Sequence, residues 1–131
     1  MKQNLTLTIT SLLSIVLMTF HMADDVVRGF EPGGFKNINF IIMMVVFLCG
    51  IVLLGGRRSG YIIMLLGGIL GCLMPLAHMR GAGLVGGRMM NSGGRFFFVW
   101  TLIALGINGG FSVILSVRGL RSMRWRRRSE A

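Results

Sequence analysis

Four long apolar stretches, separated by short polar segments, dominate this 131-residue chain. They run from about Leu5 to Ala23, from Ile38 to Leu54, from Tyr61 to Met79 and from Phe96 to Val117. A helix needs about 20 apolar residues to cross roughly 30 Å of hydrocarbon. Each stretch approaches that length, and charged residues make up only 14% of the chain. The sequence therefore predicts four transmembrane helices.

The connections between these stretches predict how the helices are arranged. Residues 55–60 read Gly-Gly-Arg-Arg-Ser-Gly, which is typical of a tight turn between two neighbouring antiparallel helices. The predicted fold is thus an all-α, four-helix transmembrane bundle of two antiparallel helical hairpins. Residues 1–117 form its single transmembrane domain, and residues 118–131 form a basic cytoplasmic tail.

The distribution of lysine and arginine predicts the orientation, because these residues are enriched in cytoplasmic loops. An even number of spans places both termini on one side. That side holds nine basic residues: Lys2, Arg57, Arg58, Arg118, Arg121, Arg124, Arg126, Arg127 and Arg128. The other side holds five: Arg28, Lys36, Arg80, Arg88 and Arg95. Both termini are therefore predicted to be cytoplasmic, in a multi-pass protein of a bacterial inner membrane.

The N-terminus also permits a second interpretation. Lys2, the apolar run after it and Ala23 have the layout of a cleaved signal peptide, which would leave three spans. A cleavage site needs a small residue two positions before Ala23, and His21 stands there. Retention of the first helix is the preferred interpretation.

The basic tail is predicted to anchor the chain at the membrane surface. Lysine and arginine next to a span are attracted to anionic inner-leaflet lipids, and tryptophan lies at the headgroup level. The anchoring residues are Arg124, Trp125, Arg126, Arg127 and Arg128. The same arginines are explained by orientation, so anionic lipid rather than nucleic acid is the expected partner.

Small and polar residues inside the spans predict helix contacts. Gly67 with Gly71 and Gly106 with Gly110 form GxxxG pairs, which permit close helix packing in lipid. Ser14, Asn108 and Ser112 are intramembrane polar residues, and Ser116 continues the line of Asn108 and Ser112 along one helical face. These side chains are expected to point into the bundle and to hydrogen-bond between helices.

One polar constellation could carry chemistry. His21 lies three and four residues before Asp24 and Asp25, and Arg28 lies one turn beyond them, so all four share one helical face. His78 ends the third span at the same membrane boundary. The predicted metal- or ligand-binding residues are His21, Asp24, Asp25 and His78, and the predicted ion-pairing residues are Arg28, Arg80 and Arg88.

Imidazole and carboxylate groups bind zinc or copper, and the nearby Met22, Met79, Met89 and Met90 favour copper. The predicted function is that of a non-enzymatic accessory or binding subunit, working with a membrane-protein partner or a second copy. Three alternatives stay open: helix capping and anchoring by the same residues, a haem protein with His21 and His78 as axial ligands, and a proton-coupled transporter or channel. A nucleophile with a matched base and a phosphate-binding loop are both absent from the sequence, so nothing in it favours an enzyme.

Overall fold

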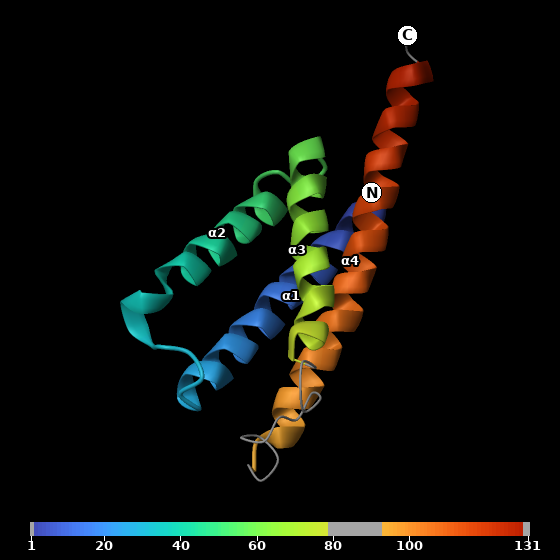
Figure 1. The fold of residues 1–131 in the computed structure, drawn as a ribbon. Coiled ribbons are helices and arrows are strands. Elements are labelled where there is room, and N and C mark those ends of the chain that lie inside the picture. Colours follow the sequence, from blue (N-terminus) through green and yellow to red (C-terminus); the bar gives the residue numbers. More distant parts are fainter. Residues whose placement is uncertain (1, 79–92, 130–131) are drawn as a thin grey trace.

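The computed structural model describes residues 2–78 and 93–129, and this part of the chain is built of helices and their connections. Helix α1 (Lys2–Val27) is followed by a short 3-10 helix, η1 (Gly34–Asn37), and then by α2 (Ile38–Val52), α3 (Arg58–His78) and α4 (Arg95–Ser129) (Figure 1). Four segments are long and apolar enough to cross a membrane. The prediction of an all-α protein with four apolar helices is therefore confirmed.

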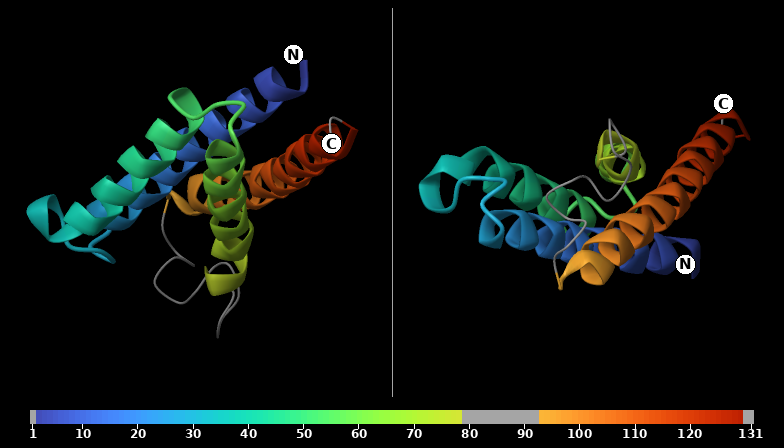
Figure 2. Two further views of the ribbon diagram at one scale, coloured as in Figure 1. Left: turned by 90° about the horizontal axis from the view of Figure 1, so that it is seen from above. Right: turned by 60° about the horizontal axis from the view of Figure 1, so that its bottom comes forward.

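Helix α4 is the centre of the arrangement, because it packs against both α3 and α1. The second helix, α2, meets α3 at the turn between them and then diverges from it (Figures 1 and 2). It is also the least buried of the four apolar helices. The polar clusters discussed below therefore depend mainly on α1, α3 and α4.

Two separate hydrophobic clusters define the two ends of the molecule. One cluster joins Leu7 of α1, Ile51 of α2, and Tyr61 and Met64 of α3. The other is built on Phe98 and Leu102 of α4. We call these the Tyr61 end and the Phe98 end. The C-terminal part of α4 extends beyond the Tyr61 end (Figure 1).

The first helix extends further than the apolar pattern predicts, and it ends at a glycine. The amide of Gly29 donates to the carbonyl of Val26, and the amide of Phe30 donates to the carbonyl of Asp25 at 2.9 Å. Gly29 has a φ of +72°, the left-handed conformation that this C-terminal capping motif requires. The cap extends α1 beyond Ala23 to Val27, so Asp24 and Asp25 lie inside its last turn. It also turns Phe30 back onto the Phe98 cluster.

Helices α3 and α4 approach closely through glycines. A Cβ atom built on Gly109 would lie 2.6 Å from the carbonyl oxygen of Gly68, and one built on Gly68 would lie 2.9 Å from the carbonyl oxygen of Gly109. Gly106 packs against the ring of Pro75 in the same interface. Close contact between the two backbones stabilises the helix pair by van der Waals packing, which is a main driving force for helix association in lipid.

The register of this contact differs from the predicted GxxxG pairs. Gly71 and Gly106 belong to the interface, but a Cβ on Gly67 would only touch Phe47 of α2 at 3.5 Å. A Cβ on Gly110 would lie 3.9 Å from the nearest atom, the sulfur of Cys72. One member of each GxxxG pair, Gly71 or Gly106, therefore lies in the close contact between α3 and α4, and the other member does not. The close pair is Gly68 with Gly109, because these residues face the neighbouring backbone.

Asn108 joins α4 to α1 in the apolar middle of the fold. Its amide nitrogen donates to the backbone carbonyl of Thr10 at 2.6 Å and to the hydroxyl of Ser14 at 2.7 Å. Ser14 in turn donates to the carbonyl of Thr10. Of the polar residues predicted to point inward, Asn108 and Ser14 thus form an interhelical hydrogen bond, whereas the buried hydroxyls of Ser112 and Ser116 have no hydrogen-bond partner among the described residues.

Replacing Asn108 with alanine should lower the free energy of unfolding by about 1 kcal/mol, the usual range for an interhelical hydrogen bond in lipid. Reversible unfolding in mixed micelles measures this change. The control is Ile107→Ala on the lipid-facing side of the same turn, where Ile107 is 60% exposed. Equal losses in the two variants would show that the hydrogen bonds at Asn108 add nothing specific.

Candidate functional site

His21 lies on the buried face of α1, near the Phe98 end. It is only 3% exposed. Because it precedes Asp25 by four residues on the same helix, its Nε2 atom comes within 3.4 Å of the Asp25 Oδ2 atom. Its Nδ1 atom is buried and has no hydrogen-bond partner among the residues that the structure describes.

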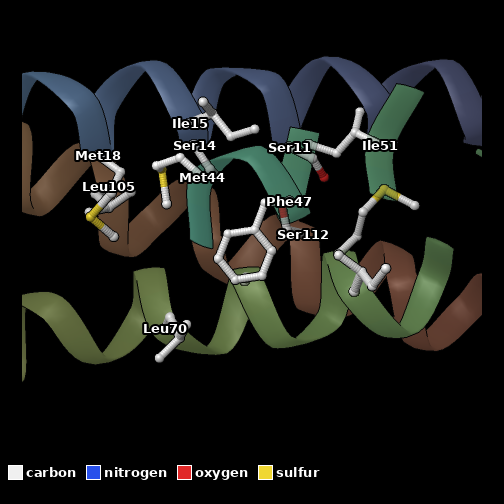
Figure 3. Close-up of a pocket in the computed structure, with 14 residues that line it drawn as sticks. Ser11, Ser14, Ile15, Met18, Met44, Phe47, Ile51, Leu70, Leu105 and Ser112 are labelled. Carbon is white, nitrogen blue, oxygen red and sulfur yellow. The ribbon is translucent and has the colours of Figure 1, made fainter. Parts of the chain in front are cut away.

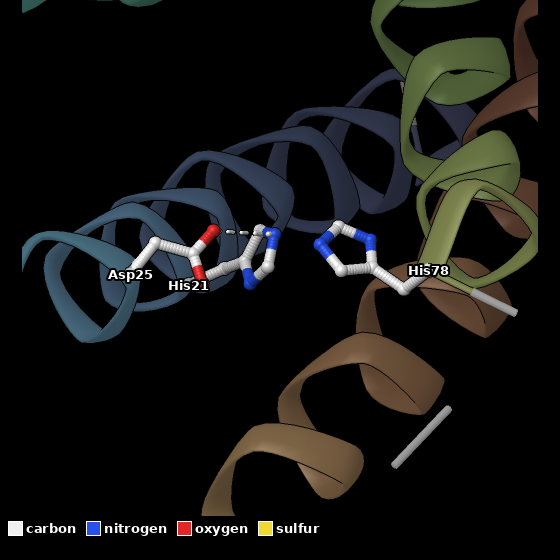
Figure 4. A group of neighbouring side chains, drawn as sticks. All are labelled: His21, Asp25 and His78. Carbon is white, nitrogen blue, oxygen red and sulfur yellow. Dashed lines mark ion pairs between the residues drawn. The ribbon is translucent and has the colours of Figure 1, made fainter. Parts of the chain in front are cut away.

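His78 is the last residue of α3, and its side chain is held by its own helix. Its Nδ1 atom lies 2.9 Å from the carbonyl oxygen of Met74. A carbonyl accepts only, so in the neutral ring the proton is on Nδ1 and Nε2 carries the free lone pair. Nε2 faces the His21 ring (Figure 4). Metal-binding histidines are commonly oriented by such a hydrogen bond from the other ring nitrogen.

The two imidazoles meet between α1 and α3. Their centroids are 4.8 Å apart and their planes make an angle of 77°. Phe98 of α4 lies 5.6 Å from each ring and is 4% exposed, so it forms an apolar wall beside both histidines. The sequence offered Phe96, Phe97 and Phe98 in a row without distinguishing them. The helical steps from Phe98 to Leu102 and Leu105, both buried, identify the inward-facing member.

His21, Asp25 and His78 form a group that could hold a metal ion. Each offers one ligand atom, and these atoms all lie within 4.8 Å of one another. Asp25 is 7% exposed, so its carboxylate is also largely removed from water. Two imidazoles and one carboxylate from two helices are therefore brought together beside Phe98, with His21 and Asp25 buried and His78 partly buried. We call these three residues the His/Asp cluster.

Asp24 does not join the His/Asp cluster, although the spacing from His21 allowed it. Its Oδ2 atom accepts a hydrogen bond from Nε of Arg28 at 2.7 Å. This bond raises the pKa of the Arg28 guanidinium. Arg28 also packs against Gly94, just before α4. Asp24 and Arg28 thus form a helix-end ion pair beside the cluster, while Arg80 and Arg88 lie outside the described residues.

The methionines predicted as soft ligands are not among the described residues of the His/Asp cluster. The sulfur of Met22 faces Asn37, whose amide nitrogen lies 4.0 Å away. Met79, Met89 and Met90 lie outside the described residues. The ligand set described around His21 is therefore nitrogen and oxygen.

A small cavity lies further along the polar face of α1. It measures about 30 Å³ and is lined by Ser11, Ser14 and Met18 of α1, and by Ser112 of α4, among mostly apolar side chains (Figure 3). Ser112 and Ser116 are 1% and 0% exposed, so this face of α4 points inward. A cavity of this size accommodates about one water molecule.

The residues predicted to anchor the chain lie at the other end of the fold. The helix α4 continues through the basic tail to Ser129 without interruption. Arg124 and Trp125 are exposed on it. The side chains of Arg126, Arg127 and Arg128 lie outside the described part of the chain.

Comparisons with protein-family models, with curated proteins and with solved structures find no match for this chain.

Proposed function

We propose that this membrane protein is a metal-binding subunit that holds one divalent transition-metal ion, preferably zinc, in the His/Asp cluster. The observation that carries the proposal is the convergence of His21, Asp25 and His78, with one ligand atom from each within 4.8 Å of the others. His21 and Asp25 lie on α1, whereas His78 ends α3, more than fifty residues later in the sequence. Helix-end anchoring, the simplest alternative, would not require the two histidines to meet.

Burial supports a bound cation at this point. A carboxylate in an apolar, enclosed environment is costly unless a cation or hydrogen-bond donors compensate it. Asp24 has such a partner in Arg28, at 2.7 Å. Asp25 lies 3.4 Å from His21, and the two imidazoles that meet it in the cluster are also good metal ligands.

The ligand set favours zinc over the copper that the methionine-rich sequence suggested. Zinc accepts imidazole nitrogen and carboxylate oxygen at about 2.0–2.2 Å, in a tetrahedron with edges of roughly 3.4 Å. The present spread of 4.8 Å must contract on binding. His78 can move inward because it stands at the end of α3. Three protein ligands leave the fourth position for water or for a donor from a partner, as in sites where the metal reacts or is exchanged.

The haem alternative fits the geometry less well. Two imidazoles on opposite faces of a haem would have their centroids roughly 6 Å apart, given bonds to iron of about 2 Å. The observed separation is 4.8 Å, and Phe98 occupies the space beside both rings. A single small ion suits this arrangement better than a porphyrin.

A proton or ion pathway also has less support than a binding site. The cavity beside Ser11 and Ser112 has a volume of about 30 Å³, and most of its lining is apolar. Such a space suits one ordered water better than a continuous aqueous route.

The proposal includes an orientation: two helical hairpins in a bacterial inner membrane, with both termini in the cytoplasm. The excess of lysine and arginine on the terminal side supports it. A reporter enzyme that works only in the cytoplasm should be active when fused after Ala131. Activity only of a reporter that must be exported would contradict the orientation.

Zinc titration of the purified, metal-free protein tests the proposed function. A competing chromophoric chelator should report one ion per chain with submicromolar affinity, and Mg²⁺ or Ca²⁺ should not displace it, since these ions prefer all-oxygen sites. The protein should show no visible haem absorption. Failure to saturate, or several equivalent weak sites, would contradict a single built site.

A further inference from the structure

A groove at the Tyr61 end lies between the start of α3 and the C-terminal part of α4. Its volume is about 320 Å³. Arg58 of α3 and Arg121 and Arg124 of α4 line it, and all three arginines are exposed. Arginine binds phosphate oxygens through a planar fork of donors, so three guanidinium groups around one hollow favour a phosphate-bearing ligand.

The rest of the groove is apolar. Ile62 of α3 and Val117, Leu120 and Met123 of α4 also line it. Leu120 and Met123 pack in addition against the buried cluster that contains Tyr61, which holds this part of α4 against α3. Gly119 lies against the Tyr61 ring in the same contact. The arginines therefore stand on a packed framework.

Charge favours an anion in this groove for two further reasons. Helix α3 begins at Arg58, so the positive end of its dipole lies at the groove. The acidic residues that the structure describes, Asp24, Asp25 and Glu31, are in or just after the last turn of α1, at the Phe98 end. No described carboxylate is therefore available nearby to neutralise Arg58, Arg121 and Arg124.

We infer that this groove is a binding site for the headgroup of an anionic phospholipid. The span that includes the α4 side of the groove ends at Trp125, which places the groove at a membrane boundary. There the arginines reach the phosphate, and the apolar lining can contact the upper part of an acyl chain. A free phosphate ion would use the arginines but gain nothing from Ile62, Val117 and Leu120.

Two pairs of arginine variants with the same change of charge test this inference. Arg58→Gln with Arg121→Gln removes two groove residues. Arg57→Gln with Arg118→Gln removes exposed neighbours that do not line the groove. Lipid binding is measured by native mass spectrometry of the full chain in detergent, with phosphatidylglycerol and phosphatidylcholine as probes.

The wild type should bind one phosphatidylglycerol per chain in preference to phosphatidylcholine. The groove pair should weaken that binding about tenfold or more, and the control pair less than threefold. Arg58→Lys with Arg121→Lys keeps the charge and should give an intermediate loss, because the bidentate contact is removed. This series also remains informative if the glutamine pair folds poorly.

Several outcomes would overturn the site. Equal losses in the two glutamine pairs would mean a general attraction of positive charge to the lipid. Unchanged binding in the groove pair would mean that the lipid binds elsewhere. Inorganic phosphate that displaces the lipid at equal concentration would identify a phosphate ion site instead.

Discussion

In the purified protein, Asp25→Asn is expected to weaken zinc binding by about 100-fold or more, whereas Asp24→Asn is expected to leave it within about threefold of the wild type. The two aspartates are adjacent on the last turn of α1, and each variant removes one negative charge. They differ in their partners. Asp25 lies 3.4 Å from His21, and Asp24 lies 2.7 Å from Arg28.

The comparison of the two aspartates isolates coordination from general electrostatics. A loss of local negative charge would lower the metal affinity similarly in both variants, since the two carboxylates lie close together. Loss of a ligand affects Asp25 alone. Competition with a chromophoric chelator gives the affinities, and circular dichroism with size-exclusion chromatography checks that both variants keep the fold.

Replacement of the histidines of the cluster should also weaken zinc binding. His78→Ala should also abolish tight zinc binding, because His78 supplies the only ligand that α3 contributes to the cluster described here. His78 is half-buried at the end of its helix, so its truncation should disturb packing little. His21 is 3% exposed, and its replacement combines loss of a ligand with a cavity in the packed interior. Normal zinc affinity in His78→Ala would contradict the cluster directly.

Gly109→Ala is expected to lower the free energy of unfolding by about 1–3 kcal/mol, the usual cost of overpacking a close contact. Its new methyl group would lie 2.6 Å from the carbonyl oxygen of Gly68, and backbone cannot move aside as a side chain can. Gly110→Ala is the matched control on the same helix, because its methyl group would lie 3.9 Å from the nearest atom.

Gly110→Ala should leave the free energy of unfolding unchanged or raise it slightly, since alanine favours a helix by about 0.8–1.0 kcal/mol over glycine in soluble hosts. Reversible unfolding in mixed micelles gives both values. Helices α3 and α4 carry His78 and Phe98, so Gly109→Ala should also weaken zinc binding, while Gly110→Ala should not. Equal stability of the two variants would mean that α3 and α4 do not pack at Gly68 and Gly109.

The sequence predicts the fold well where composition decides the outcome. Four apolar runs of membrane length require four helices, because backbone polar groups in lipid must be paired within the segment. The residues at which the helices end depend instead on local capping motifs. The end of α1 is fixed by Gly29 in a left-handed conformation, which carries the helix past Asp24 and Asp25 into a capping motif.

The candidate site was only partly predictable. The meeting of His21 and His78 could be anticipated, because the C-terminal ends of two spans separated by one other span are expected on the same side of a membrane. The choice between Asp24 and Asp25 could not, because both stand one turn from His21. Arg28 decides it by pairing with the aspartate four residues before it, Asp24.

The position of Phe98 and the choice of close-packed glycines depend on how the helices pack against one another, which is difficult to predict from a single sequence. Helical spacing relates Phe98 to Leu102 and Leu105, but it does not say which neighbouring helix that face meets. Similarly, Gly67 and Gly68 are equivalent by composition. Only the rotation of α3 against α4 places Gly68 at the Gly109 carbonyl and Gly67 towards Phe47.

The central claim is that His21, Asp25 and His78 bind one metal ion together, and X-ray absorption spectroscopy of the zinc-loaded protein tests it most directly. The account predicts one zinc per chain with two imidazole ligands and additional oxygen ligands, at about 2.0–2.2 Å. In His78→Ala, any remaining zinc should have one imidazole fewer. A spectrum with no imidazole scattering, or with sulfur ligands at about 2.3 Å, would contradict the account.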